Sequence, residues 1–308
     1  MRALVTGGAG FIGSHIVEEL LQRGASVRVL DNFSSGKRAN IESFKGDLEI
    51  QTGDLRDAEA IKAATHAVDL VFHLAAFISV PQSMLEPDSC FAINVAGTAT
   101  LLEAARQAGV RKVILSSSTA VYGNPDTFPT DEETPLKPLS PYALSKQVNE
   151  LYARLYTQTF HLPVIALRYF NVYGPRQQPD SAYAAAIPIF ARRLVNGEAI
   201  TIYGDGKQSR DFIFVKDVVR ANLLAAESES AGEAFNICTG HETSLLDLLE
   251  ELSEVSPQQP EVRFEAPRPG DIYRSLGNPE KAARAFDFRA RTSLADGLAQ
   301  TVEWMKNK

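Results

Sequence analysis

The feature that most constrains the fold is a glycine-rich turn near the start of the chain. Gly7, Gly10 and Gly13 follow the apolar run 2–6 and open the helical pattern 11–23. Glycines at this spacing allow a tight turn, let a pyrophosphate approach the backbone and let the helix pack closely on the strand. Free N–H groups at the start of the helix then hold phosphates. Because glycine turns also serve purely structural ends, the motif needs support from its surroundings.

Asp31 supplies that support. It ends the next apolar run, 26–31, and an acidic residue in this place accepts hydrogen bonds from an adenosine ribose. A carboxylate there also repels a 2′-phosphate, which favours NAD over NADP. Lys37 and Arg38 keep NADP open as the minority alternative, unless they are solvated loop charges. Asp54 is expected to bound the adenine, although it would serve equally as the cap of the helix that follows.

Short apolar runs alternate with helical segments through the first half of the chain, at 69–74, 112–116 and 164–168. Near-continuous apolar strands separated by helices indicate a parallel sheet covered on both faces. After Asn171, Gly and Pro punctuate shorter elements. We expect a smaller, loop-dominated part there, capping the carboxyl edge of the sheet where open α/β folds bind ligands. The predicted fold class is α/β, a Rossmann-type doubly wound parallel sheet with a smaller mixed α/β C-terminal domain.

A second motif predicts a proton-transfer site. Tyr142 and Lys146 lie one turn apart in a helix that begins at Pro141. An ammonium favours the phenolate and lowers the pKa of a tyrosine from about 10 toward neutrality, as a general base requires. The same spacing is frequent in exposed helix pairs. Its weight comes from the serine cluster 116–118 at the end of a strand, although strand termination and turn bonding are the plainer explanation of those hydroxyls.

Composition argues against several classes of protein. The chain has 31 Lys and Arg against 38 Asp and Glu, a formal charge of −7, which disfavours a nucleic-acid or anionic membrane partner. Cys90 and Cys238 lack metal-ligand spacing, so we expect no metal site and no disulfide framework, and a reducing cytoplasm fits. The longest apolar stretch, 67–80, contains Asp69 and His73 and is too short to span a membrane. We therefore expect a soluble cytoplasmic protein.

These motifs together resemble the extended short-chain dehydrogenase/reductase family, and within it the NAD-dependent nucleotide-sugar epimerases, most closely the UDP-glucose and UDP-N-acetylglucosamine 4-epimerases. The resemblance spans nearly the whole chain and rests on TGGAGFIG, LDN, GDLRD, VFHLAA, NVAGT, SSSTAVYG, SPYALSK, LRYFNVYGPRQ, SRDFIFVKDV and RPGD. It implies that Tyr142 is the base, that Lys146 binds the nicotinamide ribose and tunes Tyr142, and that Ser118 assists proton transfer.

The resemblance also implies which residues bind the two ligands. The set expected to contact NAD is Gly7, Gly10, Phe11, Ile12, Gly13, Asp31, Asn32, Ser35, Gly36, Asp54, Leu55, Leu74, Ala75, Ala76, Asn94, Ser116, Tyr142, Lys146 and Tyr169. The set expected to contact the UDP-sugar is Ser79, Ser118, Tyr142, Asn171, Tyr203, Arg210, Arg268, Asp271 and Ser275.

Within the second set, Asn171, Arg210 and Arg268 are similar to residues that bind the UDP diphosphate, and a guanidinium fork matches phosphate well. The alternative for Arg210 is a local ion pair with Asp211. Tyr203 is expected to stack on uracil, with a place in the core as the alternative.

The family also suggests the reaction. Related 4,6-dehydratases carry Thr-Asp-Glu where this chain has Ser118, Thr119 and Ala120, and related decarboxylases keep a Glu at the place of Ala120. Without those acids, 4-epimerisation through a transient 4-keto sugar fits best. The small Ser275 stands where glucose-only relatives have a tyrosine, which leaves volume for an N-acetyl group.

The activity expected is therefore a UDP-hexose 4-epimerase that converts UDP-glucose and UDP-galactose, and also UDP-GlcNAc and UDP-GalNAc. The alternatives are a UDP-glucuronate 4-epimerase, in which Arg176 would meet the carboxylate, and a net NAD(P)-dependent nucleotide-sugar oxidoreductase. A nucleotide-sensing binding module without chemistry is disfavoured, because binding alone does not require Ser118, Tyr142 and Lys146 together.

The expected domains are an NAD-binding part, residues 1–172, and a UDP-sugar-binding part made of 173–206 and 241–308. Residues 207–240 are expected to return to the first part.

The helices near 98–108 and 142–160 carry more apolar surface than one buried face requires. Relatives pack these two helices into a four-helix bundle, so a homodimer is expected, with burial under the chain's own loops as the alternative.

Overall fold

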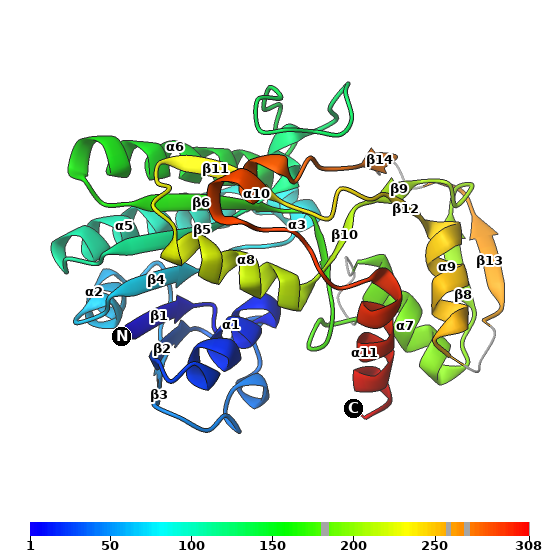
Figure 1. Ribbon diagram of the computed structural model, residues 1–308, viewed down its shortest axis with the longest axis horizontal. Coiled ribbons are helices and arrows are strands. Elements are labelled where there is room, and N and C mark those ends of the chain that lie inside the picture. Colours follow the sequence, from blue (N-terminus) through cyan, green and yellow to red (C-terminus); the bar gives the residue numbers. More distant parts are fainter. Residues whose placement is uncertain (180–184, 257–259, 268–271, 308) are drawn as a thin grey trace.

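A seven-stranded parallel sheet forms the centre of the larger part of the molecule, as Figure 1 shows for this computed structural model. The structure describes residues 1–179, 185–256, 260–267 and 272–307 of the chain. The strand order is β11-β6-β5-β4-β1-β2-β3, and all neighbours run parallel. The bounds are β1 (Arg2–Thr6), β2 (Ser26–Asp31), β3 (Leu48–Thr52), β4 (Leu70–His73), β5 (Lys112–Ser118), β6 (Val164–Tyr169) and β11 (Glu233–Ile237).

Helices cover both faces of this sheet. On one side lie α1 (Phe11–Gln22), α8 (Val215–Glu227) and α10 (Glu280–Phe286), and on the other α2 (Ala58–Thr65), α5 (Gly97–Gln107) and α6 (Pro141–Phe160). The elements α3 (Val80–Leu85), α4 (Pro87–Phe91) and the π-turn η2 (Ala92–Ala96) pack against α6, while η1 (Arg38–Asn40) and η3 (Thr119–Tyr122) are short connections.

The strands are apolar on both faces because each contributes to two cores. In β1, Ala3 and Val5 enter the core beneath α1 and α8, and Leu4 enters the core beneath α2 and α5. In β5, Ile114 belongs to the first core and Val113 to the second. Successive side chains of a strand point to opposite faces of the sheet, and here both faces are buried. The doubly wound α/β fold class is confirmed.

A smaller part, seen at the right of Figure 1, has a third core of its own. Its small sheets pair β7 with β10, β12 and β14 with β9, and β13 with β8. The bounds are β7 (Asn171–Tyr173), α7 (Ala186–Asn196), β8 (Ile200–Tyr203), β9 (Ser209–Arg210), β10 (Phe212–Phe214), β12 (Thr243–Ser244), α9 (Leu245–Glu254), β13 (Val262–Glu265), β14 (Arg274–Ser275) and α11 (Leu294–Lys306).

The expectation of a loop-dominated second part is wrong in its helices. α7, α9 and α11 contact one another, and each buries an apolar face, for example Ile187, Leu248 and Leu298. The Gly and Pro residues correctly indicated the short strands. They did not indicate the apolar faces of these three helices. Another difference concerns the start of the helix expected from residue 98. The π-turn η2 precedes this helix and runs directly into α5.

Two later segments lie on the large sheet. β11 pairs with β6, and α8 packs on β5 and β6, which supports the proposed return for residues 215–240. The first residues of the segment expected to return, 207–214, instead contribute β9 and β10 to the smaller part. α10 also contacts β11, and its Phe286 lies against Phe235 with ring centroids 5.1 Å apart. We therefore propose to add α10 to the larger part. The chain passes between the two parts several times.

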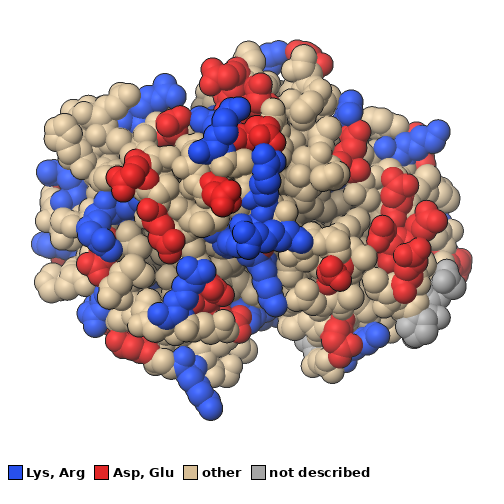
Figure 2. All heavy atoms as spheres, in the orientation of Figure 1, with Lys and Arg blue, Asp and Glu red and all other residues tan. Residues whose placement is uncertain are grey.

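The face drawn in Figure 2 mixes charges of both signs. Lys and Arg gather near its middle, and Asp and Glu gather on the right, over α9. Cys90 and Cys238 are free and buried. Within the described ranges, no three His, Cys, Asp or Glu side chains are grouped as a metal site would need. No helix in the same ranges has the length and apolar character to cross a membrane.

Candidate active site

A cavity of about 670 Å³ opens at the carboxyl edge of the large sheet. Its walls come from the segments that directly follow β1, β2, β3 and β4, from the ends of β5 and β6, and from the start of α6. Most residues expected to contact NAD line it: Gly7, Gly10, Phe11, Ile12, Gly13, Asp31, Asn32, Ser35, Gly36, Asp54, Leu55, Leu74, Ala75, Ala76, Ser116, Tyr142, Lys146 and Tyr169.

The glycine turn is shaped so that no side chain fits in it. Gly7 has φ +67°, and a Cβ there would lie 2.7 Å from the backbone nitrogen of Ala75. A Cβ on Gly13 would collide with the carbonyl of Gly7. α1 begins after Gly10 with no side-chain cap, so its first N–H groups have no intrahelical acceptor. The turn and the helix end therefore fit the pyrophosphate of a dinucleotide.

Asp31 is buried at the next corner of the cavity. Its carboxylate accepts hydrogen bonds from the backbone N–H groups of Ala9, at 2.9 Å, and Phe33, at 2.8 Å. This ties the end of β2 to the glycine turn. Asp54 also faces the cavity, where a hydrogen bond from Arg56 lowers its pKa well below the usual range. The helix cap considered for Asp54 is instead Asp57, which accepts from the first N–H groups of α2.

The serine cluster and α6 come together as expected. The Ser118 side chain acts on the Tyr142 phenol, where it opposes the rise in pKa that burial causes. Lys146 Nζ donates to the carbonyl of Ser116 at 2.8 Å and lies 5.8 Å from the Tyr142 ring centroid. α6 is held in place by its cap, Ser140, and by Ser83, whose hydroxyl accepts from the N–H of Tyr142. The predicted proton-transfer group is thus a contiguous cluster.

The electrostatics of this cluster differ from the simple expectation. Burial raises the pKa of Tyr142, and the Ser118 side chain opposes that rise. Burial lowers the pKa of Lys146 to about 8. The Lys146 ammonium is directed at Ser116 rather than at the phenol oxygen, so it does not by itself bring Tyr142 toward neutrality in this structure.

Two of the expected contact residues, Asn94 and Ser79, are not among the residues that line the cavity. The Asn94 amide, on the π-turn, accepts from the N–H of Phe77 at 2.7 Å and donates to Ser145 Oγ at 2.9 Å. It therefore holds the cavity segment that contains Phe77, and its direct contact with NAD stays a prediction. Ser79 caps α3 through a bond from Gln82, and its contact with substrate likewise stays a prediction.

Three of the residues expected to bind the UDP-sugar, Asn171, Arg210 and Ser275, lie on strands of the small sheets. Ser275 on β14 is the register partner of Arg210 on β9. Asn171, on β7, donates from its backbone to the carbonyl of Asp211 at 3.1 Å and lies opposite Phe212 on β10. Arg268 and Asp271 lie outside the described residues. Asp211 does not pair with Arg210, since its carboxylate bonds to Thr239, Gly240 and Gly277.

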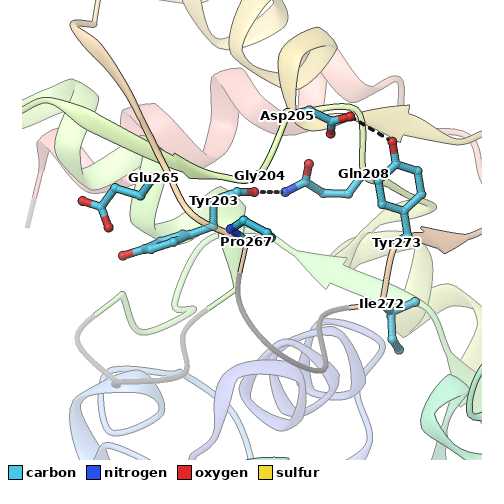
Figure 3. A pocket seen from close by; sticks show the side chains of 8 residues that line it. All are labelled: Tyr203, Gly204, Asp205, Gln208, Glu265, Pro267, Ile272 and Tyr273. Carbon is cyan, nitrogen blue, oxygen red and sulfur yellow. Dashed lines mark hydrogen bonds between the residues drawn. The ribbon is translucent and has the colours of Figure 1, made fainter.

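A second pocket, of about 520 Å³, lies in the smaller part (Figure 3). It is lined by Tyr203, Gly204, Asp205, Gln208, Glu265, Pro267, Ile272 and Tyr273. Gln208 is buried, and its Nε2 donates to the carbonyl of Tyr203 at 2.6 Å. Among the described residues its Oε1 has no hydrogen-bond partner.

Several site residues were missed by sequence reasoning. Gln208 was one, although it stands two residues before Arg210 in the GDGKQSR turn. Gln177 lines the large cavity beside Arg176, and no local pattern marked it. Arg176 was considered only as a contact for a sugar carboxylate. Its Nη2 instead lies 2.5 Å from Glu18 Oε2, which fastens the segment after β7 to α1.

Comparison with known proteins agrees with this geometry. Residues 3–238 match the model of the NAD dependent epimerase/dehydratase family. A UDP-glucose 4-epimerase of Mycolicibacterium smegmatis is 41% identical, covering 100% of this chain and 99% of the relative.

Solved structures agree as well. A UDP-N-acetylglucosamine 4-epimerase from Methanobrevibacter ruminantium, in complex with UDP-N-acetylmuramic acid, is 41% identical with a TM-score of 0.95, covering 98% of this chain and 97% of that one. A Thermus thermophilus UDP-glucose 4-epimerase in complex with NAD is 40% identical with a TM-score of 0.90, covering 99% of both chains. The expected resemblance and the NAD cofactor are confirmed, and the chain belongs to the NAD dependent epimerase/dehydratase family.

Proposed function

We propose that the protein is a UDP-sugar 4-epimerase that interconverts UDP-glucose with UDP-galactose and also accepts the N-acetylated pair. The observation that carries the proposal is the grouping of Ser118, Tyr142 and Lys146 beside the dinucleotide-shaped cavity. The next two positions, Thr119 and Ala120, have no carboxyl group. A proton can be moved at one hydroxyl there, but an elimination lacks its acid and base.

In this proposal NAD, when bound, supplies a reversible hydride acceptor, so the protein contributes placement and proton handling. The first turn of α1 would hold the pyrophosphate, and Asp31 would receive the adenosine ribose. Tyr142 Oη would take the proton of the sugar 4-hydroxyl and later return it. Ser118 would hydrogen-bond the same oxygen, and Lys146 would bind the nicotinamide ribose.

The second pocket supports a uridine nucleotide. The ring of Tyr203 offers a stacking surface. One N–H of Gln208 donates to the Tyr203 carbonyl, and its oxygen, which is buried and has no hydrogen-bond partner among the described residues, is the acceptor that we assign to a ligand. Uracil has an N–H between its two carbonyl groups and matches that acceptor, whereas cytosine has an unprotonated nitrogen in the same place. Because the nucleotide would stay bound, the 4-keto sugar could rotate within the site without dissociating.

Acceptance of N-acetyl sugars rests on Ser275. Its short side chain sits beside Arg210 in the β9–β14 pairing, so it leaves more room near the proposed diphosphate site than a tyrosine would. An unsubstituted hexose would still bind there.

The glucuronate alternative is less well supported. Arg176, the candidate for a sugar carboxylate, is engaged by Glu18 and lies near Ser14 Oγ, at 3.4 Å. Its guanidinium also stacks 5.1 Å from the Phe44 ring centroid. Recruiting Arg176 to a substrate would require breaking these contacts.

The deciding experiment incubates the purified protein separately with UDP-glucose, UDP-GlcNAc and UDP-glucuronate, with no added reductant, and identifies the products by NMR. We expect UDP-galactose and UDP-GalNAc, with no free NADH accumulating. A product formed only from UDP-glucuronate would replace the proposal with the glucuronate epimerase. Consumption of NAD(P)H in step with product would replace it with a net oxidoreductase.

A further inference from the structure

Three consecutive serines at the end of β5 meet three successive turns of α6. The Ser118 side chain acts on the pKa of Tyr142, and the Ser116 carbonyl accepts a hydrogen bond from Lys146. Ser117 donates to Glu150 Oε1 at 2.5 Å. The first two contacts belong to the proposed proton-transfer group. The third contact, between Ser117 and Glu150 one turn farther along α6, has no role in the reaction as proposed above.

Glu150 is fixed from two sides. Besides Ser117, its Oε1 accepts from Arg168 Nε at 2.9 Å and its Oε2 accepts from Arg168 Nη2 at 2.7 Å. Both side chains are buried, Arg168 5% exposed and Glu150 9% exposed. A bidentate pair of this kind has strict geometry. Because a buried ion pair contributes little net stability relative to apolar packing, the pair calls for another explanation.

The network continues to the other side of Ser118. Arg168 Nη1 donates to the phenol oxygen of Tyr122 at 2.8 Å, and Tyr122 donates to Asn236 Oδ1 on β11 at 2.7 Å. Tyr122 ends η3, the short turn that Ser118 caps. Ser118 is thus bracketed by Ser117 before it and Tyr122 after it, and both are tied to the same ion pair.

We propose that Glu150, held by Arg168, is a positioning residue for proton transfer, which sets α6 against Ser118. Glu150 also lies one helical turn after Lys146 on the same face of α6, so its charge acts on the Lys146 ammonium. This inference rests on the proposed function, because it assigns a role within the same reaction. Glu150 does not touch the cavity itself and acts through Ser117 and Lys146.

The charges around Lys146 support the electrostatic half of the proposal. The groups that face it are Tyr142 and Glu150 from α6, Ser116 from β5, the Cys90 thiol from α4 and His73 from β4. Burial lowers the pKa of His73 to about 3 and raises that of Cys90, so both are neutral near pH 7. Cys90 and Glu150 both raise the pKa of Lys146 against the larger effect of burial, and of these two Glu150 is the one held in an ion pair.

The test compares Glu150→Gln, which removes the charge, with Glu150→Asp, which keeps it. The titration of Lys146 is followed by NMR of ¹³C-lysine-labelled protein, assigned with Lys146→Met, so this reading needs no turnover. We expect the Lys146 titration to move down by about one pH unit in Glu150→Gln, the size that a neighbouring opposite charge imposes, and to stay near its original pH in Glu150→Asp. The alkaline limb of kcat should move with it while KM changes little.

Glu280→Gln is the matched control, because it removes an exposed bidentate pair with Arg289 far along the chain. It should shift neither the titration nor the rate. An unmoved Lys146 titration in Glu150→Gln, or equal movement in the Gln and Asp variants, would overturn the electrostatic role. If turnover is absent in the unaltered protein, the proposed function fails and the titration still judges this inference.

Ser117→Ala covers the case in which the Glu150 variants do not fold. It removes one hydrogen bond to the carboxylate and no charge, so we expect kcat to fall about fivefold, as loss of one such bond allows, with KM near that of the unaltered protein. An unchanged kcat in Ser117→Ala would overturn the positioning role.

Discussion

At the scale of the residue, the proposed reaction depends on a phenol that burial keeps protonated. Burial raises the pKa of Tyr142 and Ser118 opposes that rise, while Lys146 is turned toward Ser116. The positive charge of a bound oxidised nicotinamide would add to that of Lys146 and favour the phenolate. Proton transfer is thus expected to become possible only in the loaded site.

Tyr142→Phe tests the assigned base. We expect kcat to fall by about 10²- to 10⁴-fold, the usual contribution of general acid–base catalysis, because Phe retains the ring but has no exchangeable proton. The NAD content of the purified protein, measured after denaturation, should stay the same. Undiminished epimerisation would show that another group moves the proton.

Gln208→Leu tests the uracil contact. Removing the buried acceptor should raise KM for UDP-sugars about tenfold, in keeping with one hydrogen bond in a desolvated pocket, and should leave kcat nearly unchanged. Gln208→Glu serves as the second variant, since a carboxylate keeps the acceptor but loses the N–H bonded to Tyr203. A KM that is insensitive to both changes would remove Gln208 from the nucleotide site.

Ser275→Tyr tests the choice of sugar. The larger side chain should abolish turnover of UDP-GlcNAc and leave UDP-glucose turnover in place, because only the N-acetyl group needs the space. Ser275→Ala should convert both. Equal loss on both substrates in the tyrosine variant would reject Ser275 as the specificity residue.

At the scale of the element, His73 joins two strands to a helix. Its Nδ1 lies 2.7 Å from Thr6 Oγ1 on β1, and its Nε2 lies 2.9 Å from Thr98 Oγ1 on α5. Burial lowers the pKa of His73 to about 3. The folded protein therefore holds His73 neutral at pH values where the unfolded chain, with a pKa of about 6.5, binds a proton.

The sign of the pH effect follows from this depressed pKa. The contribution of His73 to stability is complete above about pH 6.5 and is lost as the pH falls toward 3, by about 1.4 kcal/mol per pH unit. His73→Gln has no such proton, so its free energy of unfolding should fall by about 2–3 kcal/mol less between pH 6.5 and 4.5 than that of the unaltered protein. Urea denaturation at the two pH values measures the difference. Parallel losses in both proteins would contradict it.

Local patterns explain which elements were predictable. The glycine turn and the Tyr142–Lys146 spacing lie within single turns of chain, so their geometry follows from their own sequence. Arg168 reads as one more residue of a buried strand, and only its tertiary pairing with Glu150 and Tyr122 shows its place. The acceptor role of Gln208 depends on a fold-dependent bond to Tyr203, which no spacing rule reports. The π-turn before α5 is equally silent in the sequence.

At the scale of the whole molecule, α6 leaves an apolar strip uncovered. Leu144, Leu151 and Leu155 lie on one face of the helix and are all exposed, the second of them at 58%. Burial under the chain's own described loops, the alternative weighed for this helix, does not cover them. This supports the proposed homodimer, in which a second copy would pack on α5 and α6.

Leu151→Glu combined with Leu155→Glu tests the dimer. We expect the unaltered protein to sediment as a dimer at micromolar concentration and the double variant as a monomer. Burying two carboxylates in the interface would cost more free energy than dimer formation provides. Phe264→Glu, equally exposed on β13, should leave the dimer intact. A monomeric unaltered protein would contradict the prediction.

Net charge was the least informative property of the molecule as a whole. An acidic chain binds the anionic NAD of its family, and Figure 2 shows mixed signs rather than a basic face. The relevant donors are local ones, such as the first N–H groups of α1. Composition averages over such groups and does not detect them.

The pairing of β11 with β6 has a consequence for recombination between relatives. A chimaera joined at a single point near residue 172 would take β11 from one parent and β6 from the other, so that a foreign strand would have to complete the sheet. A transplant of the sugar-binding part, made to exchange substrate preference, therefore requires several junctions. These junctions must keep β11 within its sheet and must keep α8 and α10 on the face that they cover. Because the chain passes between the two parts several times, several segments connect them. Any closing movement between the two parts would bend all of these connecting segments at once.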